Sequence, residues 1–107
     1  MSASQDLETY QTVDIETFAA TVTVQDEFGL HARPAANLAK TAQSFQSEIS
    51  LRAGEQTVDA KSILDILSLA ASRDTELKLT CKGIDARGAG EALVKLFEAR
   101  FNLSGEQ

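Results

Sequence analysis

Residues 18–40, FAATVTVQDEFGLHARPAANLAK, change their hydrophobic period at one point in the chain. Before that point, Ala20, Val22 and Val24 alternate with polar residues, which is typical of a half-buried strand. Gly29 interrupts the alternation, and from residue 31 to residue 45 small and apolar residues recur with helical spacing. The sequence therefore predicts a strand, a turn and a helix whose buried stripe is mostly alanine.

The rest of the chain repeats these two patterns. Alternation predicts strands over residues 48–53, 57–61 and 75–82, and the short segment GEQ is typical of a hairpin turn between the first two. Helical spacing predicts a short helix over residues 62–70 and a last helix over residues 89–101, after a turn at GIDARG. Because each strand alternates, one sheet face should be covered by helices and the other should face water. We predict an α+β fold in which a four-stranded antiparallel sheet lies under three helices, in the order βαββαβα.

Length and composition indicate a single domain, because 107 residues with 43% hydrophobic side chains suit one modest core. We assign residues 18–103 to this domain, residues 1–17 to a flexible acidic tail, and residues 104–107 to a short C-terminal tail. For residues 1–17, a partner-docking arm or a short added strand or helix remain alternatives. This segment lacks the basic and apolar regions of a secretory signal, and no run of about 18 apolar residues indicates a membrane span. We expect a cytoplasmic protein without membrane insertion.

Charge and cysteine content exclude several classes of function. The net charge of −6 repels phosphate backbones, so general nucleic-acid binding is not expected. One cysteine and one histidine cannot form a structural zinc site, and we expect neither a metal nor a cofactor. Cys81 follows the phase of Leu77 and Leu79, which predicts a buried thiol without a redox role.

The only histidine, His31, lies where the strand pattern ends and helical spacing begins, which predicts a helix N-cap. Histidine is not among the preferred N-cap residues, so its use suggests a role beyond capping. Pro34 fits the first turn, where its missing N–H has no intrahelical acceptor. The N–H groups of Ala32 and Arg33 offer an anion site at the positive helix end, and the Arg33 side chain adds a cation. A histidine beside such a site suits phosphoryl transfer, although spacing alone leaves a structural histidine open.

The segment GLHARPAA, followed 30 residues after the histidine by KSILDILSLA, resembles HPr, the histidine-containing phosphocarrier of the bacterial phosphoenolpyruvate:sugar phosphotransferase system. The resemblance extends from about Ala19 to Phe101. It implies an open-faced β-sandwich and a phosphoryl carrier rather than an enzyme. In this family His31 would accept a phosphoryl group on Nδ1 from phosphoenolpyruvate-charged Enzyme I and pass it to Enzyme IIA domains for sugar uptake. Arg33 would pair with the phosphoryl group, Pro34 would shape the turn, and we expect a monomer.

Ser62 opens the second predicted helix in a capping box with Asp65. As an N-cap it needs no further explanation. The resemblance implies a second role, since Ser62 matches the regulatory serine that HPr kinase/phosphorylase modifies in many bacteria. The added charge would be favourable at a helix N-terminus but would weaken docking to an acidic partner.

The apolar residues after Ser62 form a candidate docking patch. Leu64 lies off the helical stripe that would be buried, which consists of Ile63, Ile66, Leu67 and Ala70. With the resemblance, we expect Ile63, Leu64 and Leu67 to offer an apolar surface to Enzyme I and Enzyme IIA. Lys40 and Lys61 would supply a local basic rim.

Two other functions remain open at this point. One is an HPr-like regulatory binding module, in the nitrogen branch or in catabolite control, whose output is docking that depends on Ser62 phosphorylation. The presence of His31 with Arg33 and Pro34 argues against a purely regulatory role. The other is an anion-binding α+β domain unrelated to phosphotransfer.

Overall fold

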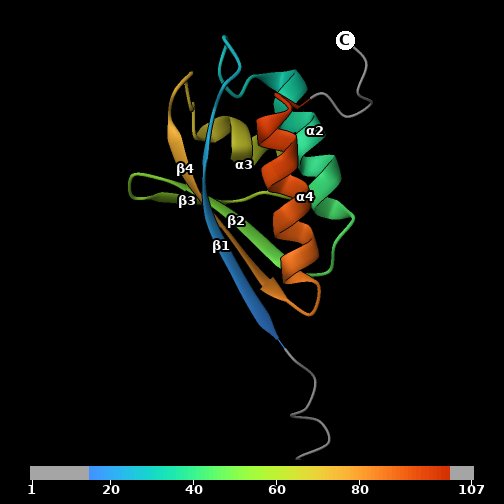
Figure 1. The fold of residues 1–107 in the computed structure, drawn as a ribbon. Helices are drawn as coiled ribbons and strands as arrows, with labels where there is room; N and C mark the ends of the chain where they lie inside the picture. Colours follow the sequence, from blue (N-terminus) through green and yellow to red (C-terminus); the bar gives the residue numbers. More distant parts are fainter. Residues whose placement is uncertain (1–14, 102–107) are drawn as a thin grey trace, which may run out of the picture.

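The computed structural model describes residues 15–101 and contains seven helices and strands (Figure 1). Their order is βαββαβα, which confirms the predicted fold. In chain order they are β1 (Glu16–Thr23), α2 (Ala32–Gln43), β2 (Glu48–Ala53), β3 (Gln56–Asp59), α3 (Ile63–Ser68), β4 (Glu76–Gly83) and α4 (Ala86–Glu98).

The four strands form one antiparallel sheet in the order β1-β4-β2-β3. The last strand in the sequence therefore lies between β1 and β2, where it pairs with both. The helices lie together on one side of the sheet and leave the other side open (Figure 1). This is the open-faced sandwich that strand alternation predicts, since each strand has one buried and one exposed row of side chains.

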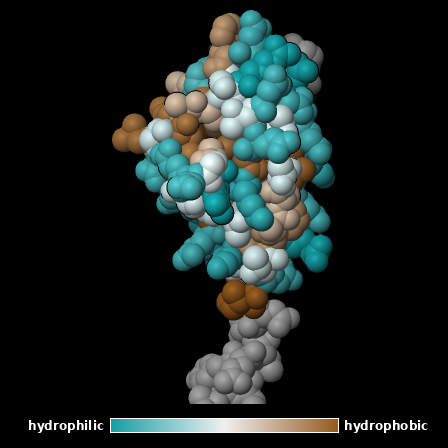
Figure 2. All heavy atoms as spheres, turned by 90° about the vertical axis from the view of Figure 1, so that its left-hand side faces the viewer, coloured by the Kyte–Doolittle hydropathy of each residue, from teal (hydrophilic) through white to brown (hydrophobic). Residues whose placement is uncertain are grey.

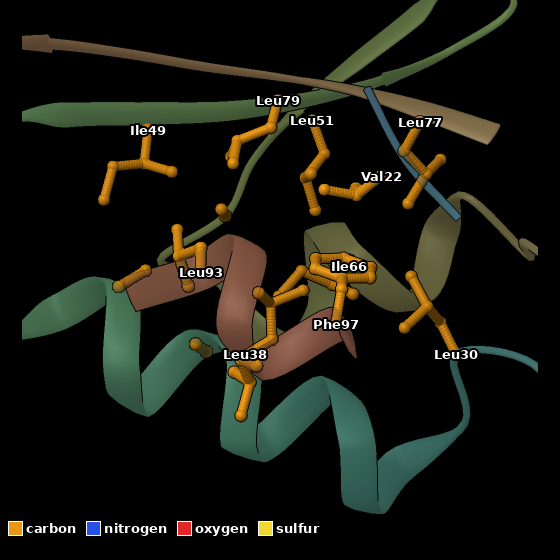
Figure 3. Packing of buried hydrophobic residues seen from close by; sticks show 14 of the residues in the cluster. Val22, Leu30, Leu38, Ile49, Leu51, Ile66, Leu77, Leu79, Leu93 and Phe97 are labelled. Carbon is orange, nitrogen blue, oxygen red and sulfur yellow. The ribbon is translucent and has the colours of Figure 1, made fainter. Parts of the chain in front are cut away.

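The core lies between the sheet and the helices (Figure 3). Leu38 of α2 and Phe97 of α4 point toward the sheet, and both are almost fully buried. Pro34 and three alanines fill the rest of the buried stripe of α2, so this helix can approach the other elements closely. The sheet contributes the inward residues of its central strands, which are Ile49, Leu51, Leu77, Leu79 and Cys81. The prediction of a buried Cys81 thiol is confirmed.

The boundaries lie within three residues of the sequence-based expectation, and the starts of two elements lie in segments that were predicted otherwise. Strand β1 begins at Glu16, inside the segment assigned to the N-terminal tail. Helix α4 begins at Ala86, three residues before the predicted start, so Gly88 lies in the helix and not in the predicted turn. A Cβ atom at Gly90 would lie 2.0 Å from Cδ1 of Phe18, so glycine lets α4 lie against β1. Residues 1–14 of the predicted N-terminal tail, the last two residues of the predicted domain (102–103) and the predicted C-terminal tail (104–107) lie outside the described residues.

Candidate functional site

His31 lies at the start of α2, as the sequence predicts. Its backbone is extended, with φ −85° and ψ −171°, and its side chain does not cap the helix by a hydrogen bond. The imidazole is 41% exposed and therefore open to a partner. Gly29, two residues before His31, has φ +75°. A Cβ atom there would lie 2.5 Å from the carbonyl oxygen of Ala71. The turn that presents His31 therefore requires glycine, for both its conformation and its space.

This turn is fixed to the loop that follows α3. The Leu30 N–H donates to the Ala71 carbonyl over 2.9 Å, and the Asp74 N–H donates to the Val24 carbonyl over 2.8 Å. Leu30 is itself buried in the core. His31 is thus held by a rigid anchor on each side, the core at Leu30 and the first turn of α2.

The first turn of α2 has the features of an anion site. Ala32 and Arg33 are exposed, and within residues 15–101 no hydrogen bond uses their N–H groups. Pro34 is fully buried and has no N–H to satisfy. Two free donors at the positive end of a helix therefore lie beside the imidazole.

Two further arginines face the same site. An open depression around His31, Ala32 and Arg33 is also lined by Arg73 and Arg100. The three arginines come from α2, from the loop after α3 and from the end of α4. Asp26 and Glu27 line the same depression, so its side chains carry a net charge of +1 without the histidine. Sequence reasoning missed Arg73 and Arg100, because they meet His31 only in the folded chain.

Arg100 is positioned by an unusual end to α4. The N–H groups of Arg100 and Phe101 donate to the carbonyls of Phe97 and Leu96, which is the hydrogen-bond pattern of a Schellman motif. Glycine is usual at the position that Arg100 occupies, where φ is +57°. The Asn37 amide of α2 donates to the Phe101 carbonyl over 3.0 Å, which fastens this end of α4 to α2.

Two residues contact the imidazole itself. An Asp26 carboxylate oxygen lies 3.4 Å from His31 Nε2, and the same oxygen accepts the Phe28 N–H over 2.9 Å. The Phe28 ring meets the imidazole edge to face, with centroids 6.0 Å apart, while 76% of Phe28 remains exposed. Sequence reasoning assigned neither residue. The sequence did offer a signal for both residues, because an acidic and an aromatic residue stand just before the Gly-x-His turn.

Ser62 is the N-cap of α3, and its hydroxyl accepts the Asp65 N–H over 3.2 Å. The predicted capping box forms only in this half. The Asp65 carboxylate accepts the N–H of Asp59 over 3.3 Å instead of the Ser62 N–H. The Ser62 N–H donates to the Asp59 carbonyl, so the backbone turn replaces the second half of the box.

The predicted docking residues of α3 differ in exposure. Leu64 is 78% and Ile63 41% exposed, whereas Leu67 packs partly against the core. Ile63 is therefore not part of the buried stripe, and Ile66 alone is fully buried in this short helix. The segment after α3 reaches Leu30 through Ala71, so α3 leads from Ser62 toward the His31 end of the molecule.

Neither predicted lysine lines the His31 depression. Lys40 is exposed in the last turn of α2, about 13 Å along the helix axis from its start. The Lys61 ammonium donates to the Phe45 carbonyl over 2.8 Å, and the Gln43 amide donates to the Lys61 carbonyl. Lys61 therefore joins the end of α2 to the start of α3. The cations beside His31 are arginines.

Sequence and fold both match known proteins. The family model described as "PTS HPr component phosphorylation site" matches residues 18–99. The phosphocarrier protein HPr of Xylella fastidiosa strain Temecula1 is 43% identical over 81 residues, which cover 76% of this chain and 91% of that protein. The crystal structure of HPr-C-His from Thermoanaerobacter tengcongensis has a TM-score of 0.77 and 40% identity, and covers 84% of this chain and 98% of that one. Crh, a catabolite repression protein of Bacillus subtilis, has a TM-score of 0.64 and 38% identity, and the match covers 73% of this chain and 90% of that one.

Among the helices within residues 15–101, none has the length and apolar character needed to cross a membrane.

Proposed function

Because the chain belongs to the HPr family of the phosphotransferase system, we propose that it accepts a phosphoryl group on His31 from phosphoenolpyruvate-charged Enzyme I and passes it to Enzyme IIA domains. The observation that carries the proposal is the position of His31, exposed at the start of α2 and beside three arginines. The protein then acts as a carrier whose His31 is phosphorylated by one partner and dephosphorylated by another. It needs no substrate pocket of its own.

The nucleophile is Nδ1 of His31. The Asp26 carboxylate faces Nε2 at 3.4 Å, which favours the tautomer that carries its proton there. Nδ1 then has a free lone pair to attack phosphorus. The new N–P bond forms as the bond between phosphorus and Enzyme I breaks, and the Nε2 proton stays in place. Asp26 also stabilises the positive charge that the ring gains during the attack.

The phosphoryl oxygens bind to the anion site at the first turn of α2. The N–H groups of Ala32 and Arg33 are available as donors, and the Arg33, Arg73 and Arg100 side chains supply positive charge. A charge-assisted hydrogen bond is stronger than a neutral one. The site remains open to solvent and partners, which allows the group to leave again.

Phosphorylation of variants tests this proposal. Wild-type protein, with Enzyme I and radiolabelled phosphoenolpyruvate, should gain one acid-labile phosphoryl group. His31→Ala should gain none, whereas Ser62→Ala should be labelled like wild type. Arg33→Ala should be labelled more slowly, because the phosphoryl oxygens lose a charged donor. Full labelling of His31→Ala would show that the group is carried elsewhere.

Transfer onward needs a surface that partners can contact. Ile63 and Leu64 of α3 are exposed, and α3 leads toward the His31 end of the molecule. We assign partner docking to this apolar surface. Leu67 of the same helix packs partly against the core and so anchors the surface. Leu64→Ser should raise the KM for Enzyme I without changing the stability of the fold, because the side chain is 78% exposed.

Ser62 is a candidate regulatory site for an HPr kinase/phosphorylase. Its hydroxyl makes one hydrogen bond, to the Asp65 N–H, and the residue is partly exposed. A phosphoryl group here would add negative charge beside Ile63 and Leu64. Ser62→Asp should therefore weaken binding to Enzyme I in isothermal titration, and Ser62→Ala should not.

A regulatory role alone is a second candidate. It is favoured by the likeness to Crh, which is named for catabolite repression. The retained His31, with Arg33 and Pro34, favours the carrier role instead. Enzyme I-dependent labelling of His31 separates the two functions, since a purely regulatory module would show none.

A further inference from the structure

The open face of the sheet carries a row of cations that phosphotransfer does not use. This face points away from the helices and is turned to the viewer in Figure 2, where hydrophilic side chains cover most of it. Strand register places Lys78 of β4 directly opposite Arg52 of β2. Thr21 of β1 flanks Lys78, and Thr57 of β3 flanks Arg52. Four strands thus contribute one row with two cations at its centre and a hydroxyl at each end.

The pairing of Arg52 with Lys78 is unfavourable for the isolated protein. Like charges that face each other across two strands destabilise a sheet. Within the described part of the chain, the one cation–carboxylate pair closer than 4.0 Å is His31–Asp26, so no acid neutralises either side chain. The Arg52 Nε donates to the Gly54 carbonyl, which leaves the other guanidinium donors free. Both side chains are exposed.

Two surface depressions meet at this pair. One is lined by Lys78, Arg52 and Thr57 and continues to Lys82 and Lys61. The other lies on the β1 side and includes Lys78, Arg52 and Thr21. Neither shares a residue with the depression around His31. Carboxylates are present on this face as well, namely Glu48 opposite Lys82 in the register, Asp59, and Glu76 on the β1 side.

We propose that this face is a second docking surface, for a partner protein that presents an extended acidic segment. Lys78 and Lys82 are four residues apart on one strand, so their side chains emerge about 13 Å apart. A single phosphate group cannot contact both, whereas two carboxylates of an extended segment can. Acids flank the row, and they would repel the continuous charge of a nucleic acid while leaving room for a narrow acidic segment.

The position of this surface has a functional consequence. It lies on the side of the sheet opposite the helices, whereas His31 lies in the helical layer at the start of α2. A partner bound to Arg52 and Lys78 would leave the His31 site uncovered. The protein could therefore be held by one partner while another exchanges its phosphoryl group. This inference does not depend on His31 being phosphorylated.

The test uses a 12-residue peptide in which Glu alternates with Ser. In an extended conformation its glutamates lie on one side about 7 Å apart, so the first and third match the spacing of Lys78 and Lys82. In 15N-labelled protein at low salt, the peptide should shift the amide signals of Arg52, Lys78 and their neighbours. A peptide with Gln in place of Glu should not.

Matched variants show whether the row itself binds. The double variant Arg52→Thr/Lys78→Thr should lower the affinity about ten-fold, since each exposed ion pair contributes a factor of up to about five. Arg87→Gln/Lys95→Gln removes the same charge from exposed positions of α4 and should change the affinity by less than about two-fold.

Four results would overturn the proposal. The first is an absence of binding at low salt, and the second is equal weakening by the two double variants, which would show an effect of total charge. The third is a shift pattern centred on Arg33, Arg73 and Arg100. The fourth is tighter binding of an oligothymidylate with the same charge as the peptide, which would assign the surface to nucleic acid and contradict the proposed partner class.

Discussion

The carboxylate of Asp26 should face charges of both signs in the phosphorylated state, and its removal tests the site geometry. In the unmodified protein this group contacts His31 Nε2 at 3.4 Å. When Nδ1 carries a phosphoryl group and Nε2 keeps its proton, the carboxylate faces the positive charge of the ring and, beyond it, about two negative charges. Asp26→Asn removes both interactions, while the amide oxygen can still accept a hydrogen bond from Nε2.

The magnitude follows from the distance. The 3.4 Å contact, the ring and the N–P bond together separate the carboxylate from phosphorus by about 7 Å, so two unit charges facing one in water repel by about 1.2 kcal/mol. The positive ring charge at the 3.4 Å contact attracts the carboxylate by about the same amount in water. The water value is appropriate because the imidazole is 41% exposed. Asp26→Asn should therefore change the equilibrium between the two states by less than about two-fold, at low salt and at about 0.15 M salt.

Competition for one phosphoryl group measures this factor directly. Wild type and Asp26→Asn, one of them 15N-labelled, are mixed with a catalytic amount of Enzyme I and limiting phosphoenolpyruvate. Intact-mass spectrometry then gives the phosphorylated fraction of each at equilibrium. Glu55→Gln removes the same charge from the exposed β2–β3 turn and should compete equally with wild type. If Asp26→Asn holds about five-fold more phosphate than wild type, the ring does not keep the Nε2 proton in the phosphorylated state as argued.

Two further predictions concern the fold. Gly90→Ala should lower the free energy of unfolding by about 1–3 kcal/mol relative to Gly88→Ala, because the new Cβ would meet the Phe18 ring at 2.0 Å whereas the nearest atom at Gly88 is 3.8 Å away. Both variants gain the same helix propensity, so urea denaturation that found them equally stable would refute this packing. Burial, together with the nearby Asp85 charge, raises the pKa of the Cys81 thiol to about 11. The unfolded thiol ionises near pH 8.5, so folding stability should fall by about 3 kcal/mol as the pH rises from about 8.5 to 11. Cys81→Ala should lack this part of the decline, and parallel curves for the two proteins would contradict the raised pKa.

The architecture follows from local patterns in the sequence. Each strand and helix buries one face, and this requirement sets the period at which apolar residues recur. The switch between periods at residues 28–31 therefore locates the turn before α2, the start of α2 and the position of His31 together. The period could not give the start of α4, because Gly88 resembles a turn residue in the sequence, whereas the fold places it in the first turn of the helix.

The surroundings of His31 illustrate what a linear pattern leaves open. Arg73 and Arg100 are far from His31 in the sequence, and ordinary exposed arginines have no period that marks them. They reach the site because the loop after α3 pairs with Leu30 and because α4 ends in a left-handed turn. The capping box of Ser62 likewise formed only in part, since Asp65 found a donor in Asp59.

The sequence by itself determined the element order, most of the buried faces and the place of the proposed nucleophile at a helix start, because these depend on neighbours within a few residues. The tertiary structure decided which charges share a surface. Strand order places β4 between β1 and β2, and only this order sets Lys78 against Arg52. Charge acts through space rather than along the chain, so the two basic sites of this acidic protein exist only in the folded state.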